Sequence, residues 1–137
     1  MTGPPGIRFT IGLLLLGVAG ISAYWVTFFA NLPTAGWDRC YVVFERAFPG
    51  ADSVLLTTSM LAVESLRRRR GVAVLWSLFT AGQFSFLGLL GASYNLQQGG
   101  YNLSIGMLAE LWVNLFCVFA AVWLSVFAWR HRRSLDG

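Results

Sequence analysis

The sequence contains no lysine, one histidine and two cysteines, and only 12% of its 137 residues are charged. Cys40 and Cys117 are far apart and form no C-x-x-C pair, so neither a disulfide framework nor a cysteine metal site is expected. His131 stands between arginines, without partners at metal-ligand spacing. No serine nucleophile with a matching histidine and no phosphate-binding glycine loop is visible. The sequence therefore predicts no metal and no cofactor, and it offers no known catalytic template.

The formal net charge of +4 comes entirely from arginine. Most arginines fall in the runs 67–70 and 130–133, which flank apolar stretches instead of spreading over one face. This distribution is typical of residues that set membrane topology, so no nucleic-acid partner is expected. Hydrophobic residues make up 56% of the chain, far above the balance of a soluble domain. A membrane protein is indicated, and the absence of lysine hints at a GC-rich bacterial source.

Four apolar stretches predict an all-α, single-domain protein, an integral membrane four-helix bundle. They cover residues 9–30, 51–66, 72–94 and 104–129. The first would span roughly 33 Å at about 1.5 Å per residue, enough for the hydrocarbon core, whereas the second is short for a span. A competing interpretation makes residues 1–19 a cleaved signal peptide, although the apolar run continues well past that point.

Between the first two stretches, residues 37–48 predict a short external amphipathic helix. Trp37, Tyr41, Phe44 and Phe48 fall on one helical face, and charged residues occupy the others. Such a helix rests its aromatic face in the membrane interface. It could cover a lipid-facing cavity, but plain packing on the membrane surface is the favoured interpretation.

The arginine run 67–70 lies in a short loop that should stay in the cytoplasm. The tail after residue 129 is also basic, and an even number of spans separates the two ends of the chain. We therefore expect a multi-pass protein of the cell (inner) membrane with both termini cytoplasmic and the two longer loops external.

Polar residues inside the apolar stretches mark the candidate site. Glu110 and Asn114 lie one turn apart on one face of the last stretch, and an acid within a bilayer indicates a functional site by default. Asp52 and Tyr94 are expected at the outer edge of the bundle, and Gln83 at mid-depth. Together the five residues predict an outward-facing polar pocket that binds a ligand.

Several functions fit this pattern. The first is binding of a small lipophilic ligand, or service as an accessory subunit to another membrane protein. The second is an intramembrane enzyme acting on a lipid, isoprenoid or steroid-like substrate, with Glu110 as general acid or base. The third is a proton-coupled transporter or channel, which would require a homo-oligomer. A purely structural role is also open, in which protonated Glu110 donates one hydrogen bond between helices. The expected partners are membrane lipid, a lipophilic small molecule or another membrane protein.

The chain resembles a group of small bacterial four-span membrane proteins of unassigned function. The resemblance covers roughly Trp37 to Arg130 and implies a topology but no activity. It rests on the arginine turn and on three segments: residues 48–52 (FPGAD), 86–90 (FLGLL) and 94–101 (YNLQQGGY). The predicted architecture is also similar to the sterol isomerase and sigma-2 receptor-like group, whose members hold amphiphilic ligands with intramembrane acids. The acids of this chain do not follow that group's pattern, so the similarity is one of architecture alone.

Overall fold

The structure is a computed structural model, and it describes residues 5–30, 39–100 and 105–135. Within these residues the chain forms only helices and turns, which confirms the all-α prediction. The helices are α1 (Ile7–Phe29), α2 (Arg39–Glu45), α3 (Pro49–Arg67), α4 (Val72–Gln97) and α5 (Ile105–Leu135).

The observed helix bounds differ from the predicted ones mainly at α2, α3 and α5. Pro49 lies between the predicted helix 37–48 and the predicted stretch 51–66, but in the structure it begins α3, where a residue without a backbone N–H is favoured because no hydrogen bond is lost. The short helix α2 stops at Glu45, and Trp37 lies outside the described residues. The last helix continues through the basic tail, where Arg132 donates to the backbone oxygen of Trp129 at 2.7 Å.

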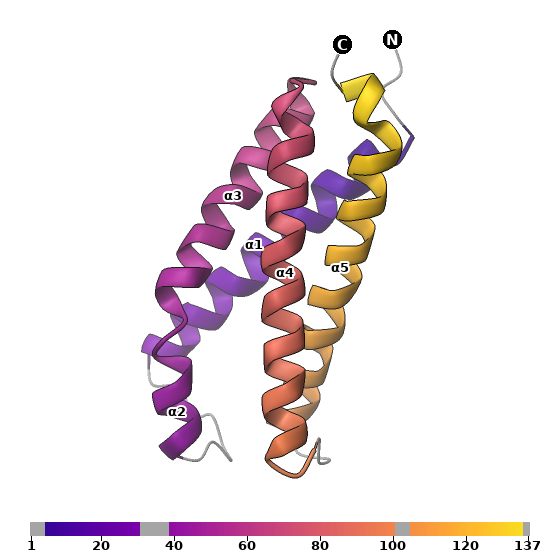
Figure 1. Cartoon of the computed structure of the whole chain (residues 1–137). Helices are drawn as coiled ribbons and strands as arrows, with labels where there is room; N and C mark the ends of the chain where they lie inside the picture. Colours follow the sequence, from indigo (N-terminus) through magenta and orange to yellow (C-terminus); the bar gives the residue numbers. More distant parts are fainter. Residues whose placement is uncertain (1–4, 31–38, 101–104, 136–137) are drawn as a thin grey trace.

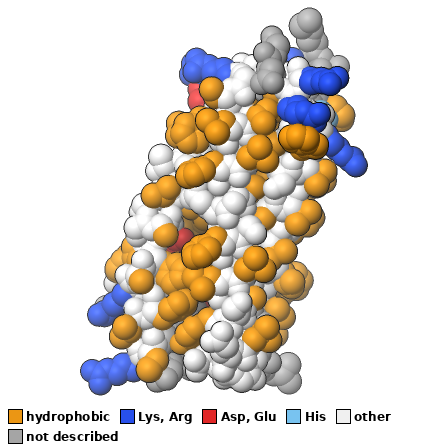
Figure 2. Space-filling view, in the orientation of Figure 1, with side chains coloured by type: hydrophobic (Ala, Val, Ile, Leu, Met, Phe, Trp, Pro, Cys, Tyr) orange, Lys and Arg blue, Asp and Glu red, His pale blue; other side chains and the backbone are white. Residues whose placement is uncertain are grey.

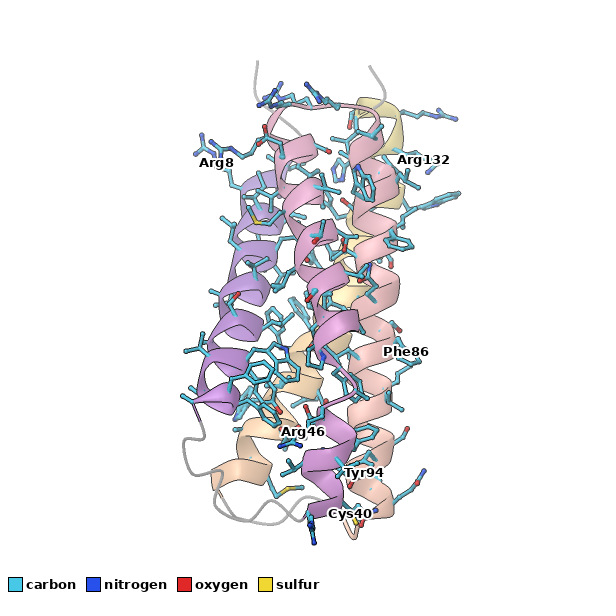
Figure 3. The ribbon with its side chains drawn as sticks, turned by 90° about the vertical axis from the view of Figure 1, so that its left-hand side faces the viewer. Arg8, Cys40, Arg46, Phe86, Tyr94 and Arg132 are labelled. Atoms are coloured by element: carbon cyan, nitrogen blue, oxygen red, sulfur yellow. The ribbon has the colours of Figure 1, made fainter. Side chains whose placement is uncertain are left out.

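The long helices α3, α4 and α5 run side by side, α1 crosses them, and α2 lies at one end (Figure 1). The beginning of α1 and the end of α5 lie at the same end of the molecule as the turn between α3 and α4, so the arginines of these segments gather there. Figure 3 shows Arg8 and Arg132 at this end and Cys40 at the other. Helix α4 packs between α3 and α5, whereas α1 crosses obliquely and contacts α3 and α5. We call the two ends the basic end and the α2 end.

Glycines let α4 and α5 approach closely. A Cβ atom at Gly88 would lie 3.0 Å from Cβ of Cys117 and 3.1 Å from the backbone oxygen of Asn114. One at Gly91 would overlap the side-chain oxygen of Asn114. Small residues serve this purpose in membrane helices, whose association depends on close van der Waals contact. The α4–α5 pair is therefore the tightly packed part of the molecule.

The outer surface is largely apolar. Figure 2 shows hydrophobic side chains over the length of one face, with arginines toward its ends, and in Figure 3 Phe86 points away from α4. Three helices, α1, α4 and α5, are long and apolar enough to cross a membrane. Exposed apolar side chains on helices of this length are expected where the solvent is lipid. The chain is accordingly a membrane protein.

Helix α3 falls outside this set because it carries many polar residues, half of them inside the molecule. Asp52, Thr58, Ser59 and Ser65 are buried. Their neighbours in the same helix satisfy several hydroxyl groups: Ser65 donates to the carbonyl of Leu61 at 2.6 Å, for example. Such back-bonding lets hydroxyl side chains sit in an apolar environment without an unpaired donor.

Candidate functional site

Near its beginning, helix α1 is attached to α5. The indole Nε1 of Trp123 donates to Thr10 Oγ1 at 3.0 Å, and the ring of Phe9 meets the Trp123 ring edge-on at 4.7 Å. Thr10 is fully buried and itself donates to the carbonyl of Gly6. These contacts fix the basic end of α1 against α5.

At its other end, α1 is held by acids from α2 and α3 instead. The indole Nε1 of Trp25 donates to Asp52 Oδ2 at 2.8 Å, and the hydroxyl of Tyr24 donates to Glu45 Oε2 at the same distance. The helix therefore passes from the side of α5 to the side of α3, as Figure 1 shows. A gap opens between α1 and α5 in the half of the molecule that faces the α2 end.

A cavity of about 310 Å³ occupies this gap, and we call it the α1/α5 cavity. Gly17, Gly20 and Tyr24 line it from α1, and Asn114 and Cys117 from α5. Most of its wall is apolar. The remaining lining residues are Leu16, Ile21, Phe44, Glu45, Phe48, Asp52, Phe84, Leu87, Gly91, Glu110, Trp112, Val113 and Phe116.

Acidic side chains from different helices reach the α1/α5 cavity. Glu45 comes from α2, Asp52 from α3 and Glu110 from α5. Among the described residues that line the cavity there is no arginine or histidine. The described part of the chain holds no group of His, Cys, Asp or Glu fit to bind a metal ion. The acids therefore surround a space large enough for a molecule and do not converge on one point.

The cavity is open toward the outside of the bundle. Two of its lining residues, Leu16 on α1 and Trp112 on α5, are 62% and 72% exposed, and Val113 is also exposed. These apolar residues face the surroundings on both sides of the gap. The opening lies between two helices that are each long and apolar enough to cross a membrane.

The structure brings together three of the five residues that the sequence singled out. Asp52, Glu110 and Asn114 all line the α1/α5 cavity, Asp52 and Asn114 being buried and Glu110 half-buried. Tyr94 is absent from the described lining, but its ring stacks at 4.4 Å on that of Phe44, which does line the cavity. Tyr94 therefore supports the wall of the site from behind.

Gln83 lies in a different place. It lines a second hollow of about 490 Å³ between α3 and α4, and its Nε2 donates to Thr58 Oγ1 at 3.0 Å. Phe48, Asp52 and Leu87 line both this α3/α4 groove and the α1/α5 cavity. The buried carboxyl group of Asp52 thus belongs to the wall that separates the two hollows.

Sequence reasoning missed Tyr24 and Glu45. Phe44 and Phe48 of the expected surface helix are half-buried and turn toward the cavity, and Glu45 goes with them, although it had been placed on the water-facing side. The Tyr24–Glu45 hydrogen bond joins residues 21 positions apart. No local sequence pattern predicts such a pair, because it forms only when α2 folds back onto α1 and α4.

Comparison of the chain with family models, with curated proteins and with solved structures finds no match. The geometry of the cavity is therefore the basis for any functional proposal.

Proposed function

We propose that this chain is a polytopic membrane protein that binds a small lipophilic ligand in the α1/α5 cavity. The observation that carries the proposal is a hollow with apolar walls that reaches Glu110 and Asn114 and opens on the apolar outer surface. Ligand sites are typically concave and apolar, with a few polar groups that orient the ligand. A filled interior around Glu110 would instead have favoured an accessory subunit.

The same proposal includes four membrane crossings, with α3 as the fourth. Helices α1 and α4 both run from the basic end to the α2 end, so the chain must return between them, and α3 makes that return. Its 19 residues extend about 28 Å at ~1.5 Å per residue, close to the thickness of the hydrocarbon core. Burial of Asp52 and Thr58 against α1 and α4 removes much of its polarity from lipid.

The orientation follows from the arginines. Residues 67–70 and 130–133 lie at the basic end, and arginine-rich segments are retained on the cytoplasmic side. Both termini would then be cytoplasmic, in the cell (inner) membrane of a bacterium. Helix α2 would be external, and the α1/α5 cavity would occupy the outer half of the bilayer.

Two glycines of α1 provide a matched test. Nothing lies within 4 Å of a Cβ atom built at Gly20 or at Gly12, so either position accepts a larger side chain. Gly20 lines the cavity and Gly12 does not. We expect Gly20→Phe to fill the opening and Gly12→Phe to leave it unchanged.

The measurement is photolabelling in phosphatidylcholine nanodiscs with a sixteen-carbon alcohol that carries a diazirine, followed by peptide mass spectrometry. Labelling should concentrate on residues of α1 and α5 around the cavity, should fall in Gly20→Phe and should persist in Gly12→Phe. Equal labelling of the two variants at these positions, or labels scattered over all lipid-facing surfaces, would contradict ligand binding in the cavity.

The position of Glu110 supports a second candidate, an intramembrane enzyme in which this acid is general acid or base. Glu110 and the buried amide of Asn114 line the same cavity and lie one turn apart on α5, an arrangement that can bind and protonate a substrate. Glu110→Gln keeps the shape of the side chain. Conversion of a bound lipid by the unmodified protein, lost in Glu110→Gln, would favour the enzyme.

A further inference from the structure

We propose that the outer side of α5 at the basic end binds the phosphate group of an anionic phospholipid from the surrounding leaflet. The site consists of Arg132, Arg133 and the exposed ring of Trp129, none of which lines the α1/α5 cavity. Three features support it: the charge of this end, the fixed position of one guanidinium group, and an apolar stripe that leads to the arginines.

Positive charge is concentrated at the basic end. Eight of the ten arginines lie in the segments that meet there, namely Arg8, residues 67–70, Arg130, Arg132 and Arg133. In the turn after α3, Arg68 pairs with Glu64. Helix α5, in contrast, has no acid between residues 111 and 135, and no carboxylate of the described residues pairs with its arginines. An anionic headgroup therefore meets positive charge on α5 that the described residues do not neutralise.

Arg132 is held in a defined position beside Trp129. Its Cζ atom lies 4.1 Å from the centroid of the Trp129 ring, and its Nη1 donates to the backbone oxygen of Trp129 at 2.7 Å. Retention on one side of a membrane requires only charge and no fixed side chain. A guanidinium group has five N–H donors in one plane, and this hydrogen bond uses one of them. The other donors can bind the oxygens of a phosphate group through two parallel hydrogen bonds.

An apolar stripe on α5 leads to these arginines. Its side chains recur at intervals of three and four residues on one helical face and are between 45% and 62% exposed: Phe119, Val122, Val126 and Trp129. Arg133, also exposed, continues this spacing one turn further. Such a face on a membrane-spanning helix contacts lipid chains, and a tryptophan at its end is typical of the interface. A phospholipid whose chain lies along this stripe places its phosphate beside Arg132 and Arg133. Figure 2 shows arginines next to exposed apolar side chains at the basic end.

Photoreactive lipids test the headgroup. Two probes share the same acyl chains, with a diazirine close to the glycerol, and carry either a phosphatidylglycerol or a phosphatidylcholine head. Each is added at low mole fraction to phosphatidylcholine nanodiscs that contain the full chain, and labelled peptides are quantified by mass spectrometry. We expect phosphatidylglycerol to label residues 126–133 about fivefold more than phosphatidylcholine, which is the effect of one arginine close to an anionic lipid surface.

Matched variants separate this site from the overall charge of the basic end. Arg132→Gln combined with Arg133→Gln should bring the ratio of phosphatidylglycerol to phosphatidylcholine labelling toward one. The control combines Arg67→Gln with Arg70→Gln, two exposed positions around the turn between α3 and α4, and removes the same charge from the same end. It should leave the ratio on α5 nearly unchanged. Arg132→Lys keeps the charge but lacks the planar fork, so it should give an intermediate ratio even if the double variant fails to fold.

Several results would overturn the proposal. Equal labelling of residues 126–133 by the two lipids removes the site, and an equal fall of the ratio in the control variant assigns the preference to the whole basic end. An unchanged ratio in Arg132→Lys contradicts the role of the fixed guanidinium. Excess glycerol phosphate in the buffer should not reduce the preference, and its loss would indicate binding of a soluble phosphate ester. None of these results bears on ligand binding in the α1/α5 cavity, because the two sites share no residue.

Discussion

The hydrogen bond between Trp25 and Asp52 should be one of the strongest single attachments between helices in this protein. It joins α1 to α3 at 2.8 Å, and both side chains are buried. Interhelical hydrogen bonds in membranes contribute about 0.6 kcal/mol on average, and those to charged groups in proteins contribute about 1.5–3 kcal/mol. We expect a coupling free energy of roughly 1.5 kcal/mol for this pair, because the indole N–H donates to a buried carboxyl group.

A double-mutant cycle measures that quantity. Trp25→Phe removes the N–H donor and keeps an aromatic ring, and Asp52→Leu removes the acceptor at similar side-chain size. The free energy of unfolding is obtained by titrating dodecyl sulfate into mixed micelles and following helix content by circular dichroism. The loss of ring volume in Trp25→Phe occurs in both halves of the cycle, so the coupling term reports the hydrogen bond.

A control cycle pairs Trp25→Phe with Thr57→Val. Thr57 is exposed on α3, and its hydroxyl donates to the carbonyl of Ser53 in the same helix, so the two changes should add within about 0.5 kcal/mol. A coupling of Trp25 with Asp52 below about 0.6 kcal/mol, no larger than that of an ordinary neutral pair, would refute the idea that this bond fixes the end of α1.

Two further predictions concern packing and topology. Gly88→Ala should destabilise the protein by about 1 kcal/mol or more, because crowding against Cys117 and the backbone of α5 outweighs the gain in helix propensity. Gly82→Ala is the control: it has open space around it and should be neutral or slightly stabilising in the same unfolding titration. Exposed Cys40 should react in intact cells with a membrane-impermeant maleimide, and Cys40→Ser should abolish this labelling because Cys117 is buried. Protection of Cys40 in intact cells but not in inverted vesicles would reverse the proposed orientation.

Much of the helical arrangement could be predicted from hydropathy and turn residues. Apolar runs bounded by arginines or glycines identified α1, α4 and α5, because lipid requires long uninterrupted apolar surfaces. The limits of α2 and α3 were less certain, since Pro49 is compatible both with the end of one helix and with the start of the next. Sequence pattern does not distinguish these cases without the direction of the following helix.

The candidate site was predictable only where polarity interrupts an apolar helix. Glu110 and Asn114 stand out on α5 for that reason, and both line the cavity. Glu45 could not be found in this way, because an acid on a short amphipathic helix is ordinary. Gln83 met the same criterion as Glu110, yet it bonds to Thr58 in the α3/α4 groove. The criterion detects residues that need polar partners but does not say which neighbouring helix supplies them.

The cavity arises from unequal attachment of the helices, and three of its lining residues, Gly17, Gly20 and Gly91, have no side chain to fill it. Gly88 allows α4 and α5 to pack closely along the middle of the bundle. Helix α1, in contrast, contacts α5 near Thr10, and its other end is held against α3 by the Trp25–Asp52 hydrogen bond. A larger residue in place of Gly17 would collide with Phe84 of α4, so this glycine allows α1 to lie as close to Phe84 as it does. The acid that holds α1 away from α5 also lines the space that results. Asp52 therefore links the stability of the fold to the polarity of the site, which explains why a costly buried carboxyl group belongs at this position.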